Sequence, residues 1–312
     1  METAKNHFEE KHHMKLSVKK TIEKRSISNV ACMMKNFSAT ILVDDYTENL
    51  TLKNEHGFSA WIEAEGRRIL FDTGQSDIFI QNACALGIDP QSADMVILSH
   101  GHYDHTGGIH ELVKRNDSLF VYCHPDVFIP RYSKQMNGLI KQIGIDKKSE
   151  DALKRIDKQI FYTTGPLYLS ADIGITGPIP RRIPFEDNGG SFFLDPLAKN
   201  ADSLEDDMSM WFSTAEGLVI VTGCCHSGLI NTIHYIRSLT GNKSVYAILG
   251  GFHLLQASSE RIESTCDYLE STGIKRIIPC HCTGNGAMET FESRFGQKVE
   301  RGKVGARFFD VI

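Results

Sequence analysis

Residues 98–108 read LSHGHYDHTGG and place four side chains of the kinds that bind metal ions within six positions. These are His100, His102, Asp104 and His105. They follow the apolar residues 95–98, which predict a short buried strand. Polar groups at a strand's end lie where loops present functional residues. The alternative is a solvated polar loop with incidental histidines, and so many ligand-type residues in one turn argue against it.

The spacing within this cluster predicts two metal positions. Residues two apart in an extended segment point the same way, so His100 and His102 would bind one ion from the same side. Asp104 and His105 lie past a turn and would face a second ion. Imidazole and carboxylate ligands together suit Zn²⁺, Fe or Mn²⁺ better than Ca²⁺.

Composition excludes several classes of partner. The chain has 312 residues, a net charge of −5, 41% hydrophobic residues and 23% charged residues, which is ordinary for a soluble globular protein. No basic stripe is present, so we expect no nucleic acid partner. The apolar runs are only a few residues long, so we expect no membrane span.

The cysteines and the N-terminal residues bear on compartment and domain organisation. Eight cysteines, some of them adjacent or flanking a histidine, suit reduced thiols better than a disulfide framework. Residues 1–36 are charged and lack the apolar stretch of a secretory signal. We therefore predict a cytoplasmic protein, with a charged N-terminal extension over 1–36 and one domain over 37–312.

The rest of the pattern predicts alternating strands and helices. Strands are expected at 37–44, 58–64, 67–71, 95–98, 119–123, 208–212, 218–221, 245–249 and 276–278, and helices at 76–86, 106–115, 227–238 and 258–271. Residues 125–165 are predicted to be irregular and partly helical, and 173–187 an extended loop rich in proline. Strands come first, helices then intersperse, and the order repeats. This predicts an α/β fold, an αβ/βα four-layer sandwich of two sheets with helices outside.

Several stretches together resemble one family. SHGHYDH resembles the HxHxDH signature of the metallo-β-lactamase-fold superfamily, and ILFDTG (69–74), GLVIVTGCCHSG (217–228) and RIIPCHCTG (276–284) resemble its other motifs. The closer match is to the dihydropteridine-synthase-like branch. It is carried by the cluster together with NEHGFS (54–59), TGPIPR (176–181), TGCCHSGLIN (222–231), LGGFHL (249–254) and PCHCTG (279–284). The resemblance runs from about residue 38 to the C-terminus and is specific only in combination.

The resemblance implies a dinuclear centre and assigns its ligands. Two sets are expected, one for each divalent ion: His100, His102 and His226, and Asp104, His105 and His281. Zn²⁺ is the expected metal, with Fe and Mn as alternatives. Asp72 would orient the metal-binding loop from behind the ligands.

Other site residues are assigned with a competing interpretation beside each. Asp104 is expected to orient water or move a proton as well as bind metal. His253 is expected at the site as an acid or substrate contact, although a core histidine is the alternative. His56 is assigned to the site on the family match, with the same alternative as His253. Asp207 is a candidate ligand, because the family's usual GHT turn is replaced here by three acidic residues, and an acidic loop explains it equally well. Arg181 would bind an anionic group of the substrate.

The cysteines near these motifs are expected to be structural. Cys280 and Cys282 flank His281, so strand alternation predicts that their side chains point away from the site. Cys224 stands where the family often has a bridging aspartate. We interpret Cys224 and Cys225 as small buried thiols in preference to metal contacts.

The predicted function is hydrolysis of a small ester or phosphodiester-type substrate through a metal-activated hydroxide. One alternative, also implied by the resemblance, is a synthase that joins a dihydropterin diphosphate to an aminobenzene ribose phosphate. Another is a non-catalytic binding module, against which the complete HxHxDH set argues. A di-iron redox protein is a further alternative, but that type needs a flavin domain, and 312 residues leave no room for one after the sandwich. The expected partner is a small-molecule substrate, with phosphorylated compounds among the candidates. A homo-oligomer is left open.

Overall fold

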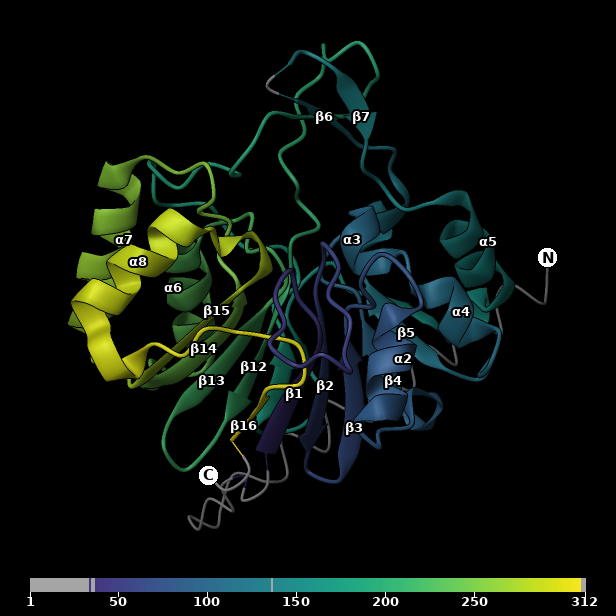
Figure 1. The fold of residues 1–312 in the computed structure, drawn as a ribbon, viewed down its shortest axis with the longest axis horizontal. Coiled ribbons are helices and arrows are strands. Elements are labelled where there is room, and N and C mark those ends of the chain that lie inside the picture. Colours follow the sequence, from purple (N-terminus) through teal and green to yellow (C-terminus); the bar gives the residue numbers. More distant parts are fainter. Residues whose placement is uncertain (1–33, 35–36, 136, 310–312) are drawn as a thin grey trace, which may run out of the picture. The chain divides into compact units, whose positions relative to one another are not determined.

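A computed structural model describes residue 34, residues 37–135 and residues 137–309 (Figure 1). The chain divides into two units, residues 1–33 and residues 34–312. The predicted extension over 1–36 lies, apart from Met34, outside the described residues. All of the described residues belong to the second unit.

One sheet has seven strands and begins with the predicted hairpin. Its order is β16-β1-β2-β3-β4-β5-β8. The bounds are β1 Phe37–Val43, β2 Ser59–Ala64, β3 Arg67–Phe71, β4 Met95–Ile97, β5 Phe120–Cys123, β8 Ile160–Tyr162 and β16 Arg307–Phe308. Pairing is parallel from β3 to β8. Glu65 and Gly66, with φ of 51° and 74°, form the tight turn between β2 and β3.

The second sheet has six strands in the order β15-β14-β13-β12-β10-β9. The bounds are β9 Leu167–Tyr168, β10 Ile173–Ile175, β12 Ser209–Ser213, β13 Leu218–Thr222, β14 Val245–Gly251 and β15 Arg276–Cys280. β12 and β13 are the second predicted hairpin, and β13, β14 and β15 run parallel.

Helices cover the outer faces of both sheets. The bounds are α2 Ile78–Ala85, α3 Tyr103–Thr106, α4 Ile109–Val113, α5 Lys147–Arg155, α6 Leu229–Leu239, α7 Ser259–Thr272 and α8 Asn285–Phe295. Figure 1 shows α2, α4 and α5 beside the seven-stranded sheet and α6, α7 and α8 beside the six-stranded one. The predicted αβ/βα four-layer sandwich is confirmed. No helix within the described ranges is long and apolar enough to cross a bilayer.

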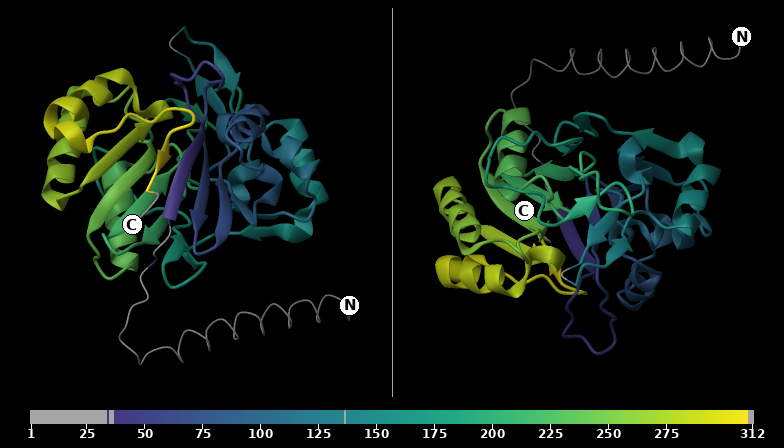
Figure 2. Two further views of the ribbon diagram at one scale, coloured as in Figure 1. Left: turned by 60° about the horizontal axis from the view of Figure 1, so that its bottom comes forward. Right: turned by 90° about the horizontal axis from the view of Figure 1, so that it is seen from above.

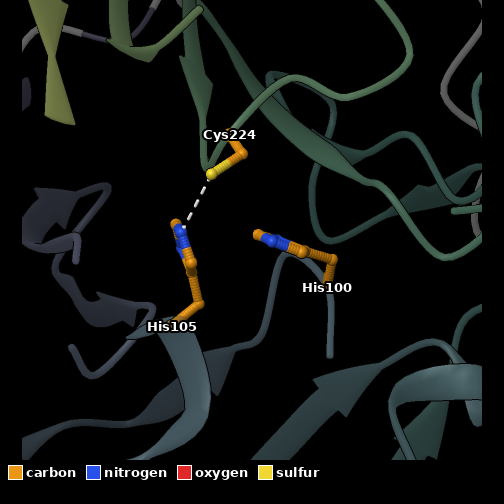
Figure 3. A group of neighbouring side chains, drawn as sticks. All are labelled: His100, His105 and Cys224. Carbon is orange, nitrogen blue, oxygen red and sulfur yellow. Dashed lines mark hydrogen bonds between the residues drawn. The ribbon is translucent and has the colours of Figure 1, made fainter. Parts of the chain in front are cut away.

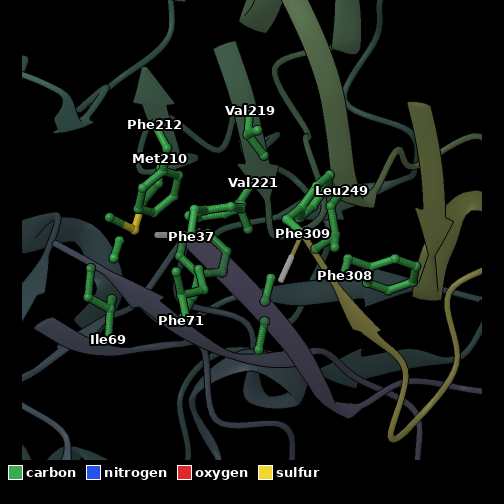
Figure 4. Packing of buried hydrophobic residues seen from close by; sticks show 14 of the residues in the cluster. Phe37, Ile69, Phe71, Met210, Phe212, Val219, Val221, Leu249, Phe308 and Phe309 are labelled. Carbon is green, nitrogen blue, oxygen red and sulfur yellow. The ribbon is translucent and has the colours of Figure 1, made fainter. Parts of the chain in front are cut away.

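Strand alternation divides the buried side chains among three cores. Phe71 and Val221 face the opposite sheet, in the central core of Figure 4. Their neighbours Leu70 and Ile220 point outward, under the helices on either side. The rings of Phe37 and Phe212 meet across the central core with their centroids 4.6 Å apart. The period-2 pattern of the sequence therefore holds the two sheets face to face.

A third, small sheet was not predicted. It consists of β6 Tyr132–Lys134, β7 Ile140–Gln142 and β11 Phe192–Phe193, in the order β11-β6-β7. In Figures 1 and 2 the β6–β7 hairpin projects beyond the ends of the large sheets. The prediction of an irregular segment over 125–165 is wrong where it holds β6, β7 and β8, because strands of three residues are too short to show a period. The loop predicted over 173–187 likewise begins with strand β10.

One predicted helix is interrupted and one helix was not predicted. Instead of a helix over 106–115, α3 ends at Thr106 and α4 begins at Ile109. Gly107 and Gly108 separate them, and a Cβ on Gly108 would lie 2.3 Å from the carbonyl oxygen of Thr73. The chain passes so close to its neighbour there that only glycine fits. Helix α8 was not predicted, although its buried residues Ala287, Met288, Phe291 and Phe295 lie on one helical face.

Candidate metal centre

The candidate ligands gather where the parallel strands of both sheets end. His100 lies three residues after β4, His226 lies in the turn after β13, and His253 and His281 follow β14 and β15. The carboxyl ends of neighbouring parallel strands meet at one edge of a sheet, where ligands bind in folds of this kind. The fold thus brings together residues from both halves of the chain.

Four non-glycine residues at these strand ends have left-handed backbone. Their φ angles are 58° for Asp72, 61° for Cys225, 46° for His253 and 46° for His281. Such a conformation costs on the order of 1–3 kcal/mol and is found mostly at functional sites. It turns the chain sharply at the strand end, so that the polar side chains face one another.

The first ligand group contains three buried histidines. His100, His102 and His226 each offer one ring nitrogen, and these atoms lie within 4.8 Å of one another. Nδ1 of His226 donates to the carbonyl oxygen of Asn188 at 2.9 Å, so its Nε2 carries the lone pair. Nε2 of His102 and Nε2 of His226 are buried without a hydrogen-bond partner. Burial lowers the pKa of all three imidazoles well below the ordinary value, so they are neutral, as ligands must be.

The second ligand group combines a carboxylate with two imidazoles. Asp104 Oδ2 lies 3.3 Å from Nε2 of His281 and 3.8 Å from Nε2 of His105. Nδ1 of His105 lies 2.7 Å from Asp72 Oδ2, and Nδ1 of His281 lies 2.7 Å from Asp45 Oδ1. A carboxylate only accepts, so both rings carry the proton on Nδ1 and turn Nε2 to the site.

Charge is concentrated in this second group. Burial alone would raise the pKa of Asp104, but His105 and His281 hold it well below its usual range. Burial likewise opposes protonation of His281, yet Cys282 and the carboxylates of Asp104 and Asp45 hold its pKa well above the ordinary value. The pocket thus favours positive charge at the position of Nε2. A divalent cation bound there would take the proton's place.

Asp72 lies next to His105 and to the loop that carries the histidine cluster. Its buried carboxylate accepts from the backbone N–H of Ser99 and from Ser99 Oγ, each at 2.7 Å, as well as from His105. It therefore ties the end of β3 to the loop that carries the histidine cluster.

The interpretation of Cys224 as only a buried structural thiol is incomplete. Its sulfur lies 3.1 Å from Nε2 of His105 and belongs to one ligand group with His100 and His105 (Figure 3). Cys225 is turned the other way, with Sγ 3.3 Å from Thr232 Oγ1 in α6. Cys224 therefore occupies the centre, and Cys225 fits the structural interpretation.

The prediction that Cys282 points away from the site is wrong. Its sulfur forms a ligand group with Cys224 and His253. Strand β15 ends at Cys280, and the short 3-10 helix His281–Thr283 follows, so strand alternation no longer applies beyond that point. Cys280, still in the strand, packs into the central core as predicted.

His253 and His56 both reach the centre. The ring of His253 lies 4.3 Å from that of His226 between centroids, and its Nδ1 is buried without a partner. Burial lowers the pKa of His253 to about 4. His56 is half-exposed at the rim, with Nδ1 3.0 Å from Asp45 Oδ2 and Nε2 3.3 Å from Asp104 Oδ2.

Asp207 and Arg181 are not brought to the ligands. Asp207 accepts from the backbone N–H of Ser227 at 2.8 Å and belongs to none of the ligand groups among the described residues. Arg181 donates to the carbonyl oxygens of His226 and Ser203, each at 2.6 Å. Both residues brace the loop that carries His226, and the guanidinium is engaged by backbone instead of facing a substrate anion.

A cavity of about 860 Å³ opens onto the centre. Its floor includes Asp104, His253 and His281, and the small third sheet contributes Lys141 and Phe192. The volume lies within the range of small-molecule sites. Sequence patterns gave no signal for Phe192 or Lys141, because both come from very short strands. Asp45, which orients two histidines, was not predicted, although Asp44 and Asp45 are the first two residues after β1.

Comparison with known proteins places this geometry in a family. The sequence profile described as the metallo-beta-lactamase superfamily matches residues 53–196. A 7,8-dihydropterin-6-methyl-4-(beta-D-ribofuranosyl)-aminobenzene-5'-phosphate synthase of Methanocaldococcus jannaschii is 32% identical over 86% of this chain and 95% of the relative. The chain belongs to the metallo-β-lactamase superfamily. The resemblance to the synthase-like branch is confirmed with it.

Two further relatives of this metallo-β-lactamase superfamily member support the same placement. An uncharacterised protein of M. jannaschii is 36% identical over 80% of this chain and 91% of its own. A crystal structure described as a metal-dependent hydrolase of the beta-lactamase superfamily aligns with a TM-score of 0.73 and 30% identity. It covers 87% of this chain, and the alignment includes 98% of that protein.

Proposed function

We propose that this protein is a metal-dependent hydrolase that acts on a small ester or phosphodiester and binds two divalent ions, with Zn²⁺ the expected metal. The observation that supports it is the pair of ligand groups, each with three ligand atoms within 4.8 Å of one another. The buried Nε2 atoms of His102, His226 and His281 lack hydrogen-bond partners in the protein, as expected of atoms that bind metal. The donor set therefore fits divalent metals.

Each residue then has a defined task. When bound, the metals would polarise the substrate's carbonyl or phosphoryl oxygen and lower the pKa of water. Asp104, held ionised by His105 and His281, would accept the proton of the attacking water. His253 would present a neutral imidazole to the cavity and donate a hydrogen bond to the leaving group. Asp45 would hold His56 and His281 in orientation.

The cavity supports a small anionic substrate. Lys134 and Lys141 of the third sheet line it together with Asp104 and His281. Phe192 lies with its ring centroid 5.3 Å from those of His102 and His226, and it would cover an apolar part of the substrate. A phosphorylated small molecule fits this combination of cationic and aromatic lining.

The test is hydrolysis by metal-free protein reconstituted with Zn²⁺, Mn²⁺ or Fe²⁺, on a panel of esters, thioesters and phosphodiesters. Asp104→Asn should lower kcat by about 10²–10⁴-fold. Asp94→Asn is the matched control, because Asp94 pairs with Arg68 at the surface, away from the cavity lining. Failure of the fully reconstituted wild type to hydrolyse any member of the panel would contradict the proposal.

A second function is favoured by the relative from M. jannaschii, which is named as a synthase and matches along almost its whole length. In that reaction the same residues would assist departure of diphosphate from a dihydropterin diphosphate, and an aminobenzene ribose phosphate would displace it in place of water. Diphosphate release distinguishes the two. Release that requires the aminobenzene compound indicates the synthase, and release without it indicates hydrolysis.

A further inference from the structure

We propose that Cys224 is itself a metal ligand. Its sulfur belongs to two ligand groups, one with His100 and His105 and the other with His253 and Cys282. The centre would then bind thiophilic cations such as Zn²⁺ or Cd²⁺ in preference to hard cations such as Mn²⁺. The inference rests on the proposed function only in that the centre binds metal ions.

The position of the Cys224 sulfur carries the first step. Asp72 fixes the proton of His105 on Nδ1, so Nε2 turns its lone pair toward Sγ at 3.1 Å. The thiol therefore donates to the nitrogen that should bind metal. When an ion enters, the S–H loses its proton to solvent, and sulfur and nitrogen face the ion together. Cys224 thus stands at the meeting point of two ligand groups.

A second sulfur lies beside the first. Sγ of Cys224, Sγ of Cys282 and a ring nitrogen of His253 lie within 4.8 Å of one another. Gly251, at the end of β14 between the two cysteine segments, makes this approach possible. A Cβ there would lie 2.7 Å from Sγ of Cys282 and 3.3 Å from Cα of Cys224.

The chemistry of this donor set decides the metal. Thiolate and imidazole ligands select Zn²⁺ and softer ions, whereas carboxylate and water suit Mn²⁺ and Mg²⁺. Two thiols with an imidazole match the Cys and His ligand sets of zinc sites. The orientation is particular to these two cysteines, since Cys225 faces α6 and Cys280 faces the central core.

The test uses Co²⁺ as the metal in the full chain, because thiolate ligands give cobalt an intense near-ultraviolet charge-transfer band that nitrogen and oxygen ligands do not. Wild type should show this band at saturation. Cys224→Ser should strongly weaken the band and lower metal affinity roughly 10–100-fold, and Cys282→Ser should reduce the band. Cys225→Ser is the matched control, a buried neighbour turned away from the centre, and should keep the band.

Cys224→Asp distinguishes loss of the thiolate ligand from a failure to fold. It should still bind metal with a strongly weakened cobalt band, and the ratio of Mn²⁺ to Cd²⁺ affinity should rise at least about tenfold. Wild type that binds cobalt without the band, or Cys224→Ser that keeps the band at full intensity, would overturn the inference and leave the hydrolase proposal standing. A thiolate band in a protein without hydrolytic activity would sink the hydrolase proposal and support the inference.

Discussion

Single hydrogen bonds decide which nitrogen of each imidazole is free to bind metal. Oxygens of Asp72, Asp45 and Asn188 accept a hydrogen bond from Nδ1–H of His105, His281 and His226, respectively. His105 was predictable from the cluster at one strand end, and His226 and His281 from the family motifs. Their acceptors were only partly so: Asp72 lies in a recognisable motif, whereas Asn188 belongs to a loop whose path no local pattern indicates.

Asp72→Asn tests the orientation of His105. The amide oxygen of Asn can replace only part of the carboxylate, and its NH₂ group would meet donors on Ser99 or His105. We expect metal affinity to fall about 10–100-fold with the fold retained, as measured by competition with a chromophoric chelator. Asp94→Asn should not change it. Equal affinity in Asp72→Asn and wild type would rule out this orienting role.

Asp207 should make stability depend on pH. Burial raises its pKa to about 6 from the ordinary 3.8. Between those values the unfolded chain releases its proton while the folded chain keeps it, so the stability falls as pH rises through this window. At roughly 1.4 kcal/mol per pKa unit, the loss is up to about 3 kcal/mol.

Comparison with Asp207→Asn isolates this contribution. The amide oxygen can still accept from Ser227, but the side chain no longer titrates. In denaturant melts with a chelator present, wild type should therefore lose stability relative to the variant between pH 4 and pH 6 or so. A stability difference that stays constant over that range would show that Asp207 titrates normally.

Strands whose alternating pattern extends over their whole length were predictable. Strands that depend on packing against a neighbouring strand were not. The β2–β3 and β12–β13 hairpins show alternation over whole strands. Strand β10 follows instead from what packs on it: Gly174 lies opposite Trp211 in the register with β12, and the indole fills the space that a side chain would need. The three prolines and two glycines of residues 173–187, Gly174 among them, had instead predicted a loop.

Gly174→Ala should destabilise the six-stranded sheet. The added Cβ would lie 2.0 Å from Cζ2 of Trp211, so the indole must move within a buried strand pair. Overpacking of this kind costs about 1–3 kcal/mol, visible as a lower Tm. Gly165→Ala, where a Cβ meets nothing within 4 Å, should leave Tm nearly unchanged. Equal effects of the two substitutions would contradict this packing argument.

In the whole domain, the core between the sheets holds the two halves of the candidate metal centre in position. The first sheet carries the cluster after β4, and the second carries Cys224, His226, His253 and His281. Four layers could be predicted from the order of strands and helices. The third sheet and its place over the cavity could not, because they depend on pairing between segments about 60 residues apart, β6 with β11.

Phe212→Ala should weaken the whole domain. Its ring is fully buried between the sheets, so its removal leaves a cavity and should cost about 3–5 kcal/mol in the free energy of unfolding. Phe161→Ala, at the exposed edge strand β8, should cost less than about 1 kcal/mol. Urea denaturation measures both. Similar losses in the two variants would mean that the inter-sheet core does not dominate stability.

We propose that this fold holds a dinuclear metal centre. Elemental analysis of protein purified without added metal tests this proposal, with His102→Ala as the test variant. His234→Ala is the control, because His234 packs on Tyr268 and belongs to none of the ligand groups in the described part of the chain. We predict about two equivalents of metal in wild type and His234→Ala and a sharp fall in His102→Ala. Wild type that holds no metal and takes up none on reconstitution would contradict the claim and favour a non-catalytic binding module.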